Sequence, residues 1–352
     1  MTLELPVDDL TMYGSISLGI PSIDGVISAD EIVDSAQSIL NLQLPNGMIL
    51  WFEDGHSDPW NHVEAAMALS VAGFFQEAEQ AYGWLCESQL GDGSWYNYYL
   101  EDSVEDYRKD TNVCAYVATG VWHHYLITRD HTFLTQMFSC VESALDFVVS
   151  LQRDDGAITW CVEPDGSFGQ YGLLTGSSSI HKSLQCGSSI ARCLGKDKPE
   201  WDRAMVKLGK AIRGNPTGFE PKERWAMDWY YPVLSGALNR DQGRKLIAEN
   251  WNKFVIDGVG VRCVSDQPWV TAAETAECVM ALEAVGLVDQ ALDLFSWIQF
   301  MRAPDGAYWT GWVIPDKVHF PGGETTSYTS AAVILAAAAL SSIDESSGIF
   351  RV

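Results

Sequence analysis

The sequence predicts an all-α protein, an α/α toroid (α6/α6 barrel) of six helical hairpins with a small-residue inner ring and an amphipathic outer ring. Three observations predict this fold. Amphipathic helical stretches alternate with stretches rich in alanine, serine and glycine, a glutamine–glycine motif recurs along the chain, and strand patterns are few. Helix pairs that repeat in this way bury a continuous core only when neighbouring pairs pack together.

The outer ring is predicted from stretches whose apolar residues recur at helical spacing. In one of them, Ala144, Phe147, Val148 and Leu151 fall on a single face. Such a face covers a core while the opposite face meets solvent. Six such helices are expected, at residues 30–43, 74–89, 132–152, 199–213, 241–254 and 287–301.

The inner ring is predicted from helices that open on a polar cluster and then contain mostly small residues. Pro59 at a first helical position and Thr271-Ala-Ala-Glu274, which has the pattern of a capping box, are recognised start signals. Strands are expected only in connecting loops, at residues 157–162 and 258–264. The expected inner helices run from Asp58 to Val71, from Asp110 to Leu126, from Thr175 to Cys193, from Asp228 into 232–238, from Thr271 to Val285 and from Glu324 to Leu340.

A short motif, glutamine, three residues, glycine and then a tryptophan, follows three of the amphipathic stretches. The glycine suits a left-handed turn just after a helix end. A fourth copy has arginine in place of glutamine. The copies are Gln43 to Gly47 with Trp51, Gln89 to Gly93 with Trp95, Gln152 to Gly156 with Trp160, and Arg302 to Gly306 with Trp309.

The segment EQAYGWLCESQLGDGSW at residues 79–95 resembles the Gln-Trp repeat of the prenyltransferase and squalene-cyclase (terpenoid cyclase) families, which share an α/α toroid. The architecture is also similar to that of the six-hairpin glycosidases. The resemblance covers nearly the whole chain as architecture but only four short motifs as sequence, and one scaffold hosts unrelated chemistries. The Asp-x-Asp-Asp acid motif of protonation-type cyclases is absent, and Asp154-Asp155 lies in a turn motif.

The leading functional prediction is a carbohydrate-active enzyme, a glycoside hydrolase or related sugar-processing enzyme that uses paired carboxylates in a central cavity lined by tryptophan and tyrosine. Asp110 and Asp228 are the first-choice acid and base, with Asp58 and Glu274 as substitutes. Carboxylates bind sugar hydroxyls, and aromatic faces stack on pyranose rings. The expected substrate-binding residues are Trp60, His62, Glu64, Asp106, Asn112, Trp225, Trp229, Tyr230, Arg262, Asp266, Trp269, Tyr308, Trp309, Trp312 and Glu324.

These residues also have structural interpretations. Asp58, Asp110 and Asp228 stand where N-cap residues stand, and Glu277 is predicted to be a solvated charge on the outer face of its helix. Two other functions therefore remain open: a terpenoid cyclase or prenyltransferase acting on an isoprenoid, and a toroid that binds a partner without catalysis.

Composition excludes several classes of protein. The 22 basic and 47 acidic residues give a formal net charge of −25, which opposes binding to nucleic acid or anionic lipid. No apolar run reaches the roughly 18–20 residues of a membrane span. Eight scattered cysteines indicate free thiols in the cytoplasm. No metal or cofactor motif is found, so no cofactor is expected and the partner is a small-molecule or oligosaccharide substrate.

The domain organisation is predicted as one catalytic unit with short ends. Residues 1–27 are expected to form an N-terminal extension, 28–342 a single toroid domain and 343–352 a C-terminal tail. No linker rich in proline, serine or glycine divides the chain.

Overall fold

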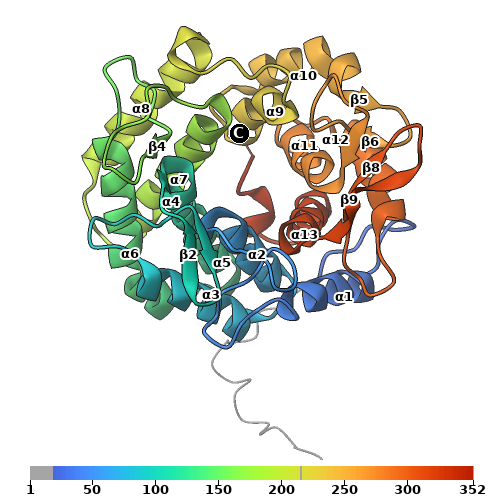
Figure 1. The fold of residues 1–352 in the computed structure, drawn as a ribbon, viewed down its shortest axis with the longest axis horizontal. Coiled ribbons are helices and arrows are strands. Elements are labelled where there is room, and N and C mark those ends of the chain that lie inside the picture. Colours follow the sequence, from blue (N-terminus) through green and yellow to red (C-terminus); the bar gives the residue numbers. More distant parts are fainter. Residues whose placement is uncertain (1–18, 215, 352) are drawn as a thin grey trace, which may run out of the picture.

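Helices dominate the structure, a computed structural model that describes residues 19–214 and 216–351. Residues 1–18 of the expected N-terminal extension lie outside the described residues. Figure 1 shows the helices in two layers, with one set near the centre and a second set around it. Small antiparallel sheets occupy the connections between them.

The outer helices confirm the amphipathic stretches to within about three residues at each end. In the first, Ile32, Ala36 and Ile39 face the core and are fully buried. The last continues as a 3-10 turn over Ile298–Met301. The outer helices are α1 (Ala29–Leu40), α3 (Phe75–Ser88), α6 (His131–Ser150), α8 (Pro199–Gly214), α10 (Arg240–Phe254) and α12 (Val288–Trp297).

The inner helices pack against one another in chain order. In α2, every residue from Pro59 to Val71 is buried, as expected for a helix surrounded on all sides. They are α2 (Pro59–Val71), α4 (Thr111–Ala115) continued by α5 (Val117–Thr128), α7 (Leu174–Cys193), α9 (Ala226–Leu234), α11 (Ala272–Ala284) and α13 (Ser327–Ser341). Contacts run from α2 to α5, α7, α9, α11 and α13 in turn, and α13 contacts α2 again.

The ninth helix differs from its prediction. It spans Ala226–Leu234, whereas the sequence predicted 232–238 with Asp228 before it. Pro232 therefore lies inside the helix, and Asp228 lies in its first turn, where a carboxylate interacts favourably with the helix dipole. The helix ends before Gly236, which has a φ of 70°. The prediction was wrong because it took Pro232 as a helix start.

The repeated glutamine motif connects neighbouring outer helices. The Gln89 side chain donates hydrogen bonds to the Gly93 carbonyl (2.9 Å) in its own turn and to the Cys140 carbonyl (2.9 Å) in α6. Gln43 makes the same pair of bonds to Gly47 and Glu77, and Gln152 makes it to Gly156 and Ala204. Each motif thus ties one outer helix to the next.

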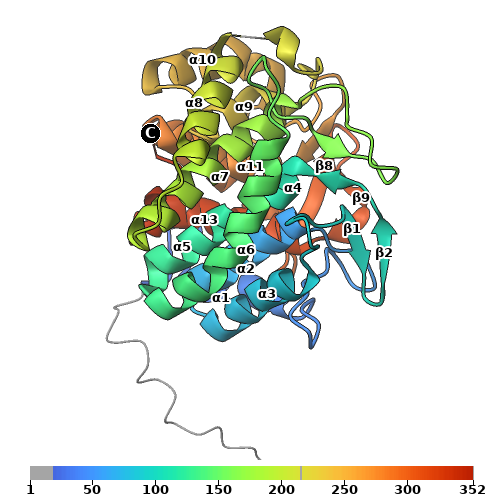
Figure 2. The same ribbon diagram turned by 90° about the vertical axis from the view of Figure 1, so that its left-hand side faces the viewer.

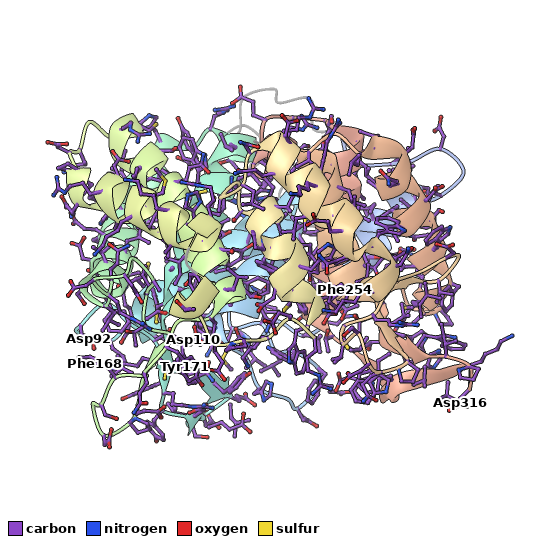
Figure 3. All side chains as sticks on the ribbon, turned by 90° about the horizontal axis from the view of Figure 1, so that it is seen from above. Asp92, Asp110, Phe168, Tyr171, Phe254 and Asp316 are labelled. Atoms are coloured by element: carbon purple, nitrogen blue, oxygen red, sulfur yellow. The ribbon has the colours of Figure 1, made fainter. Side chains whose placement is uncertain are left out.

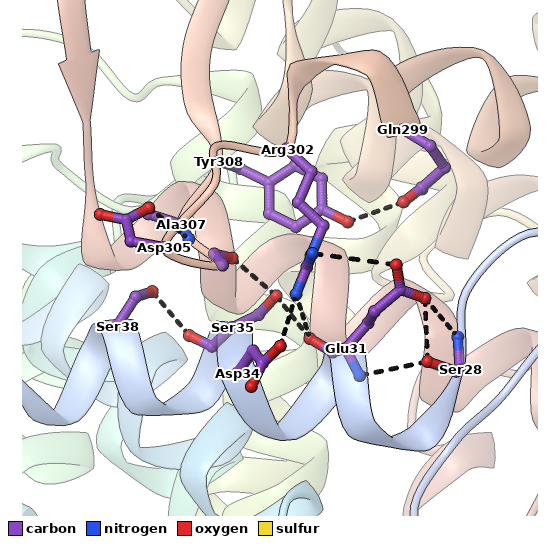
Figure 4. A network of polar contacts seen from close by, with 11 residues as sticks. Ser28, Glu31, Asp34, Ser35, Ser38, Gln299, Arg302, Asp305, Ala307 and Tyr308 are labelled. Carbon is purple, nitrogen blue, oxygen red and sulfur yellow. Dashed lines mark hydrogen bonds and ion pairs between the residues drawn. The ribbon is translucent and has the colours of Figure 1, made fainter.

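Arginine in the fourth copy of the motif connects the last hairpin to the first helix. Arg302 donates to the Glu31 carbonyl (3.3 Å) and forms an ion pair with Asp34 (3.2 Å), both in α1. Figure 4 shows this network, in which the Ser35 hydroxyl also donates to the Gly306 carbonyl at 2.8 Å. The position occupied by glutamine elsewhere therefore holds α12 and α1 together.

Glycine in the motif is required by both backbone conformation and space. Gly93 has a φ of 88°, and a Cβ there would lie 2.1 Å from the Ser143 carbonyl oxygen in α6. Gly47, Gly156 and Gly306 likewise have φ between 90° and 96°. Only glycine combines this conformation with so close an approach of two backbones.

The strands lie at one end of the helical body (Figure 2). The sequence predicted the regions of β4 and β6 but missed the longer hairpin β8–β9, whose aromatic and β-branched residues favour strands. All pairs are antiparallel: β1 (Tyr98–Leu100) with β2 (Ser103–Asp106), β3 (Lys109–Asp110) with β4 (Cys161–Val162), β5 (Val255–Ile256) with β6 (Gly260–Val261), and β8 (Trp309–Val313) between β7 (Trp269–Thr271) and β9 (Val318–Thr325).

Candidate active site

The loops that lead into the inner helices meet at the end that carries the sheets. Asp58 caps α2 and Asp110 caps α4. Figure 3 shows Asp110 at this end of the molecule, among loops that project beyond the helices. An N-cap aspartate satisfies backbone N–H groups that the helix itself leaves without partners.

Asp58 is buried, and both of its carboxylate oxygens accept hydrogen bonds. The backbone N–H groups of Trp60 (2.9 Å) and Asn61 (3.0 Å) bond to Oδ1, while the Trp51 indole (2.7 Å) and the Asn61 amide bond to Oδ2. Burial raises the pKa of Asp58 even though these hydrogen bonds lower it. The carboxyl group is therefore held rigidly and binds a proton more readily than an exposed aspartate does.

Only one of the two carboxylate oxygens of Asp110 accepts hydrogen bonds from the described residues. Its Oδ1 accepts the N–H groups of Asn112 (2.8 Å) and Val113 (3.2 Å), and among the described residues none donates a hydrogen bond to Oδ2. Burial raises the pKa of Asp110 to about 6, and the nearby charge of Asp58 adds to the increase. A carboxyl group with a free oxygen and a raised pKa is suited to proton transfer.

Asp106, beside this pair, is held as an anion. Arg108 donates to both carboxylate oxygens, at 3.2 and 3.0 Å from Nε, and Asn97 adds a bond of 2.9 Å. These bonds lower the pKa of Asp106 to about 2, with that to Arg108 the largest cause. Because its oxygens are occupied and it stays ionised, Asp106 is placed to orient Arg108, whose guanidinium lies 5.7 Å from the Trp160 ring.

A cavity of about 220 Å³ brings Asp110 and Asp228 together although they are far apart in the sequence. Asp228 accepts hydrogen bonds from the backbone N–H (3.2 Å) and hydroxyl (2.6 Å) of Thr175, both at Oδ1. Burial raises the pKa of Asp228. Asn112 and Trp225, two predicted substrate-binding residues, line the same cavity.

A second group of predicted residues forms a polar cluster in the centre of the inner helices. Trp60 stacks on Tyr116 at a centroid distance of 4.7 Å. The Tyr116 hydroxyl donates to buried Glu64, and the Tyr230 hydroxyl donates to buried Glu277. Burial raises the pKa of Glu64 to about 7 and that of Glu277 to about 8.

The prediction that Glu277 is a solvated charge was wrong. Its side chain is 1% exposed, because α11 is an inner helix surrounded by α9, α12 and α13 and has no outer face. Glu274, one turn earlier, is partly exposed, and burial raises its pKa. The capping box predicted for Thr271 is absent, since its side chain accepts no cap hydrogen bond.

The β7–β8–β9 sheet presents stacked aromatic rings. Trp309 stacks on His319 at 4.3 Å, and Trp269 stacks on Phe320 at 4.7 Å. Trp312 meets the edge of His319 at 5.1 Å. The remaining predicted residues near this sheet are Arg262, which is bridged to β7, Asp266, which pairs with Arg224 at 2.8 Å, and Glu324, which accepts the Thr310 hydroxyl at 3.2 Å.

Three predicted residues lie in the packing between inner and outer helices instead. The ring nitrogens of His62 contact the Ile49 N–H (3.1 Å) and the Ala81 carbonyl (2.8 Å), and burial lowers its pKa to about 4. Trp229 donates to Leu246 of α10 at 3.1 Å. Tyr308 is fully buried and donates to Gln299 at 2.7 Å. A sequence pattern does not distinguish such positions from a cavity wall.

Over the described residues, no group of three or more histidine, cysteine, aspartate or glutamate side chains is arranged to hold a metal ion. The eight cysteines are free thiols, of which six are buried, while Cys193 is partly exposed and Cys86 is exposed. No helix in residues 19–214 or 216–351 combines the length and apolar character needed to cross a membrane.

Comparison with known proteins identifies a relative in sequence. The chain is 46% identical over 332 residues to the MMP endo-(1,4)-3-O-methyl-alpha-D-mannosidase of Mycolicibacterium hassiacum, an alignment that covers 94% of this chain and 92% of that enzyme. No protein-family model matches the chain.

Solved structures share the fold at low sequence identity. A glycosidase variant in complex with glucose has a TM-score of 0.69 and 14% identity over 88% of this chain and 95% of its own. The GH63 mannosylglycerate hydrolase of Thermus thermophilus, in complex with Tris and D-glycerate, has a TM-score of 0.68 and 11% identity over 86% and 99%.

These comparisons correct the predicted resemblance to the prenyltransferase and squalene-cyclase repeat. The similar structures include glycosidases and a D-mannose isomerase, which agrees with the six-hairpin glycosidase architecture and not with the cyclase one. The resemblance was wrong because the glutamine motif is a way of joining outer helices, as its bonds to Glu77, Cys140 and Ala204 show. A motif whose role is to join helices does not indicate which reaction a protein catalyses.

Proposed function

The chain belongs to the family of the Mycolicibacterium hassiacum MMP endo-(1,4)-3-O-methyl-alpha-D-mannosidase and is a glycoside hydrolase, and we propose that it hydrolyses internal α-(1,4) bonds between 3-O-methyl-D-mannose units. The high coverage of both chains supports the same substrate class. We also infer that the helix pairs form an α/α toroid, with 28–342 as the catalytic domain, 1–27 as an extension and 343–352 as a tail.

The general acid comes from the Asp58–Asp110 pair. Burial raises the pKa of both carboxyl groups, and the charge of Asp58 adds to the increase at Asp110, whose pKa is about 6. Asp110 is the first candidate because its Oδ2 is free, and Asp58 is the substitute. The acid protonates the glycosidic oxygen while the bond from that oxygen to the anomeric carbon breaks.

The second carboxylate acts from the other side of the site. Asp228 is the first candidate because it lines the same cavity as Asp110, and Glu274 is the substitute because it lies at the start of α11, one turn above the central tyrosine cluster. In an inverting reaction this carboxylate takes a proton from water, whose oxygen bonds to the anomeric carbon. In a retaining reaction it bonds to that carbon first, and water then replaces it.

The shared cavity of Asp110 and Asp228 is the observation that carries this proposal, and four variants test it. Asp58→Asn, Asp110→Asn, Asp228→Asn and Glu274→Gln would be assayed on an α-(1,4)-linked 3-O-methyl-mannose oligosaccharide. Loss of the acid or base is expected to lower kcat by roughly 10²- to 10⁴-fold. Asparagine caps helices as well as aspartate does, and only one oxygen of Asp110 accepts hydrogen bonds, so Asp110→Asn is expected to fold.

An activated aryl glycoside distinguishes the two roles. Its leaving group needs no proton, so the acid variant regains activity on it, whereas the variant lacking the second carboxylate does not. Asp92→Asn is the matched control, since Asp92 is an exposed aspartate that pairs with Lys109 in the same region. Retention of activity within about tenfold in both Asp58→Asn and Asp110→Asn would overturn the assignment of the acid.

A further inference from the structure

Polar and apolar side chains both line the cavity that contains Asp110 and Asp228. The polar ones are the two carboxylates, Thr111, Asn112, Thr175, Ser177 and Lys222. The apolar ones, here called the apolar wall, are Ile158, Trp160, Leu173, Ile180, Trp225 and Met227. An unmodified sugar carries hydroxyl groups around its ring, and the carbon atoms of the apolar wall offer them no hydrogen-bond partners.

The wall is built by the same elements that position the proposed carboxylates. Met227 and Asp228 are neighbours in the first turn of α9, and Trp225 is the residue before that helix. Leu173 and Ile180 come from the start of α7. Gly176 lies between them and brings α7 close to α4, since a Cβ there would be 3.3 Å from the Asn112 Cβ. The apolar wall is therefore fixed relative to the carboxylates.

The size of the cavity limits what it receives. Its volume of about 220 Å³ is below the roughly 300–1,000 Å³ of pockets for drug-sized ligands. One sugar unit or part of one suits this volume. A group that enters it lies within reach of Asp110 and Asp228.

We propose that the apolar wall is the subsite that receives the O-methyl group of the sugar unit at the cleavage point, and that Met227 determines the preference for methylated over unmethylated substrate. This inference rests on the proposed function and assigns its specificity. A methyl ether buried against these side chains gains apolar contact. A hydroxyl placed against the Met227 side chain loses bonds to water and gains no comparable hydrogen bond from it, which favours the methylated sugar at this position.

The test compares Met227→Gln, which keeps the side-chain length but adds an amide, with wild-type protein. The ratio of kcat/KM for a 3-O-methylated α-(1,4)-manno-oligosaccharide to that for its unmethylated analogue is expected to fall about tenfold, the effect of one methyl-sized contact. Met227→Leu keeps the wall apolar and is expected to keep the ratio. Met205→Gln, on partly exposed α8, controls for the polar substitution itself.

A binding measurement separates this inference from the proposed function. In saturation-transfer NMR with methyl 3-O-methyl-α-D-mannoside, the 3-O-methyl protons are expected to receive the strongest saturation, and Met227→Gln to reduce it. An unchanged substrate ratio together with unchanged saturation in Met227→Gln would overturn the assignment. Wild-type protein that hydrolyses neither oligosaccharide but saturates the O-methyl protons would refute the proposed function and leave this subsite standing.

Discussion

Replacing Glu277 with glutamine should change how the stability of the protein depends on pH. Glu277 is 1% exposed and faces Tyr230 and Tyr231 of α9, Tyr328 of α13 and Glu64 of α2. Burial raises its pKa from 4.5 to about 8. The folded protein therefore keeps this proton up to about pH 8, whereas the unfolded chain loses it near pH 4.5.

The sign of the effect follows from proton counting. Between these two pKa values the unfolded chain binds fewer protons than the folded protein, so the free energy of unfolding falls as pH rises. The slope is about 1.4 kcal/mol per pH unit, so the loss between pH 5.5 and 7.5 is about 3 kcal/mol. At about 2 cal/mol/K of unfolding entropy per residue, that corresponds to about 4 °C in Tm. Glutamine does not ionise, so the variant does not lose this free energy of unfolding as pH rises.

The assay is the apparent Tm of wild-type protein and Glu277→Gln, measured at one scan rate from pH 5.5 to 7.5. Wild-type protein is expected to lose about 4 °C relative to the variant over this range. Glu87→Gln, an exposed glutamate on α3, serves as the control and is expected to follow wild-type protein. Parallel curves for wild-type protein and Glu277→Gln would refute the reasoning that a buried, protonated Glu277 sets this dependence.

Two further predictions follow from the turn motif and from Asp110. Gly93→Ala should lower Tm by about 4 °C, since strain at positive φ and overpacking together cost about 3 kcal/mol. The control Gly91→Ala should leave Tm unchanged, because a Cβ at that position would meet nothing within 4 Å. Equal Tm values for the two variants in a thermal-shift assay would show that the close approach of Gly93 to Ser143 is not needed. The pH profile of kcat/KM should decline above about pH 6, where Asp110 loses the proton it donates, and an activity that is flat from pH 5 to 8 would contradict this role.

Much of the helical layout could be predicted from the sequence because its causes are local. The spacing of Ala144, Phe147 and Val148 gives α6 an apolar face whatever surrounds it. Asp58 before Pro59 marks a helix start by the bonds a cap makes within three residues. The prediction for α9 was wrong because a proline can mark the start of a helix, as predicted for Pro232, or lie inside one, as Pro232 does.

The candidate site was predicted only as a set of residue types. Asp110 and Asp228 belong to helices separated by more than one hundred residues, and only the packing of α4, α7 and α9 puts them in one cavity. His62 and Tyr308 have residue types that suit a sugar site, yet their hydrogen bonds to Ala81 and Gln299 occupy them in the packing.

By itself the sequence determined where most helices begin and end, α9 excepted, and which residues recur at the turns, since hydrogen bonds and steric limits within a few residues decide these features. Tertiary structure alone decided that Glu277 faces Tyr230 and Tyr231 rather than water. A helix in contact with neighbours on all sides has no solvent face, and periodicity along α11 carries no information about those neighbours. The burial of this charge, and the raised pKa that results from it, therefore depend on how the helices pack together.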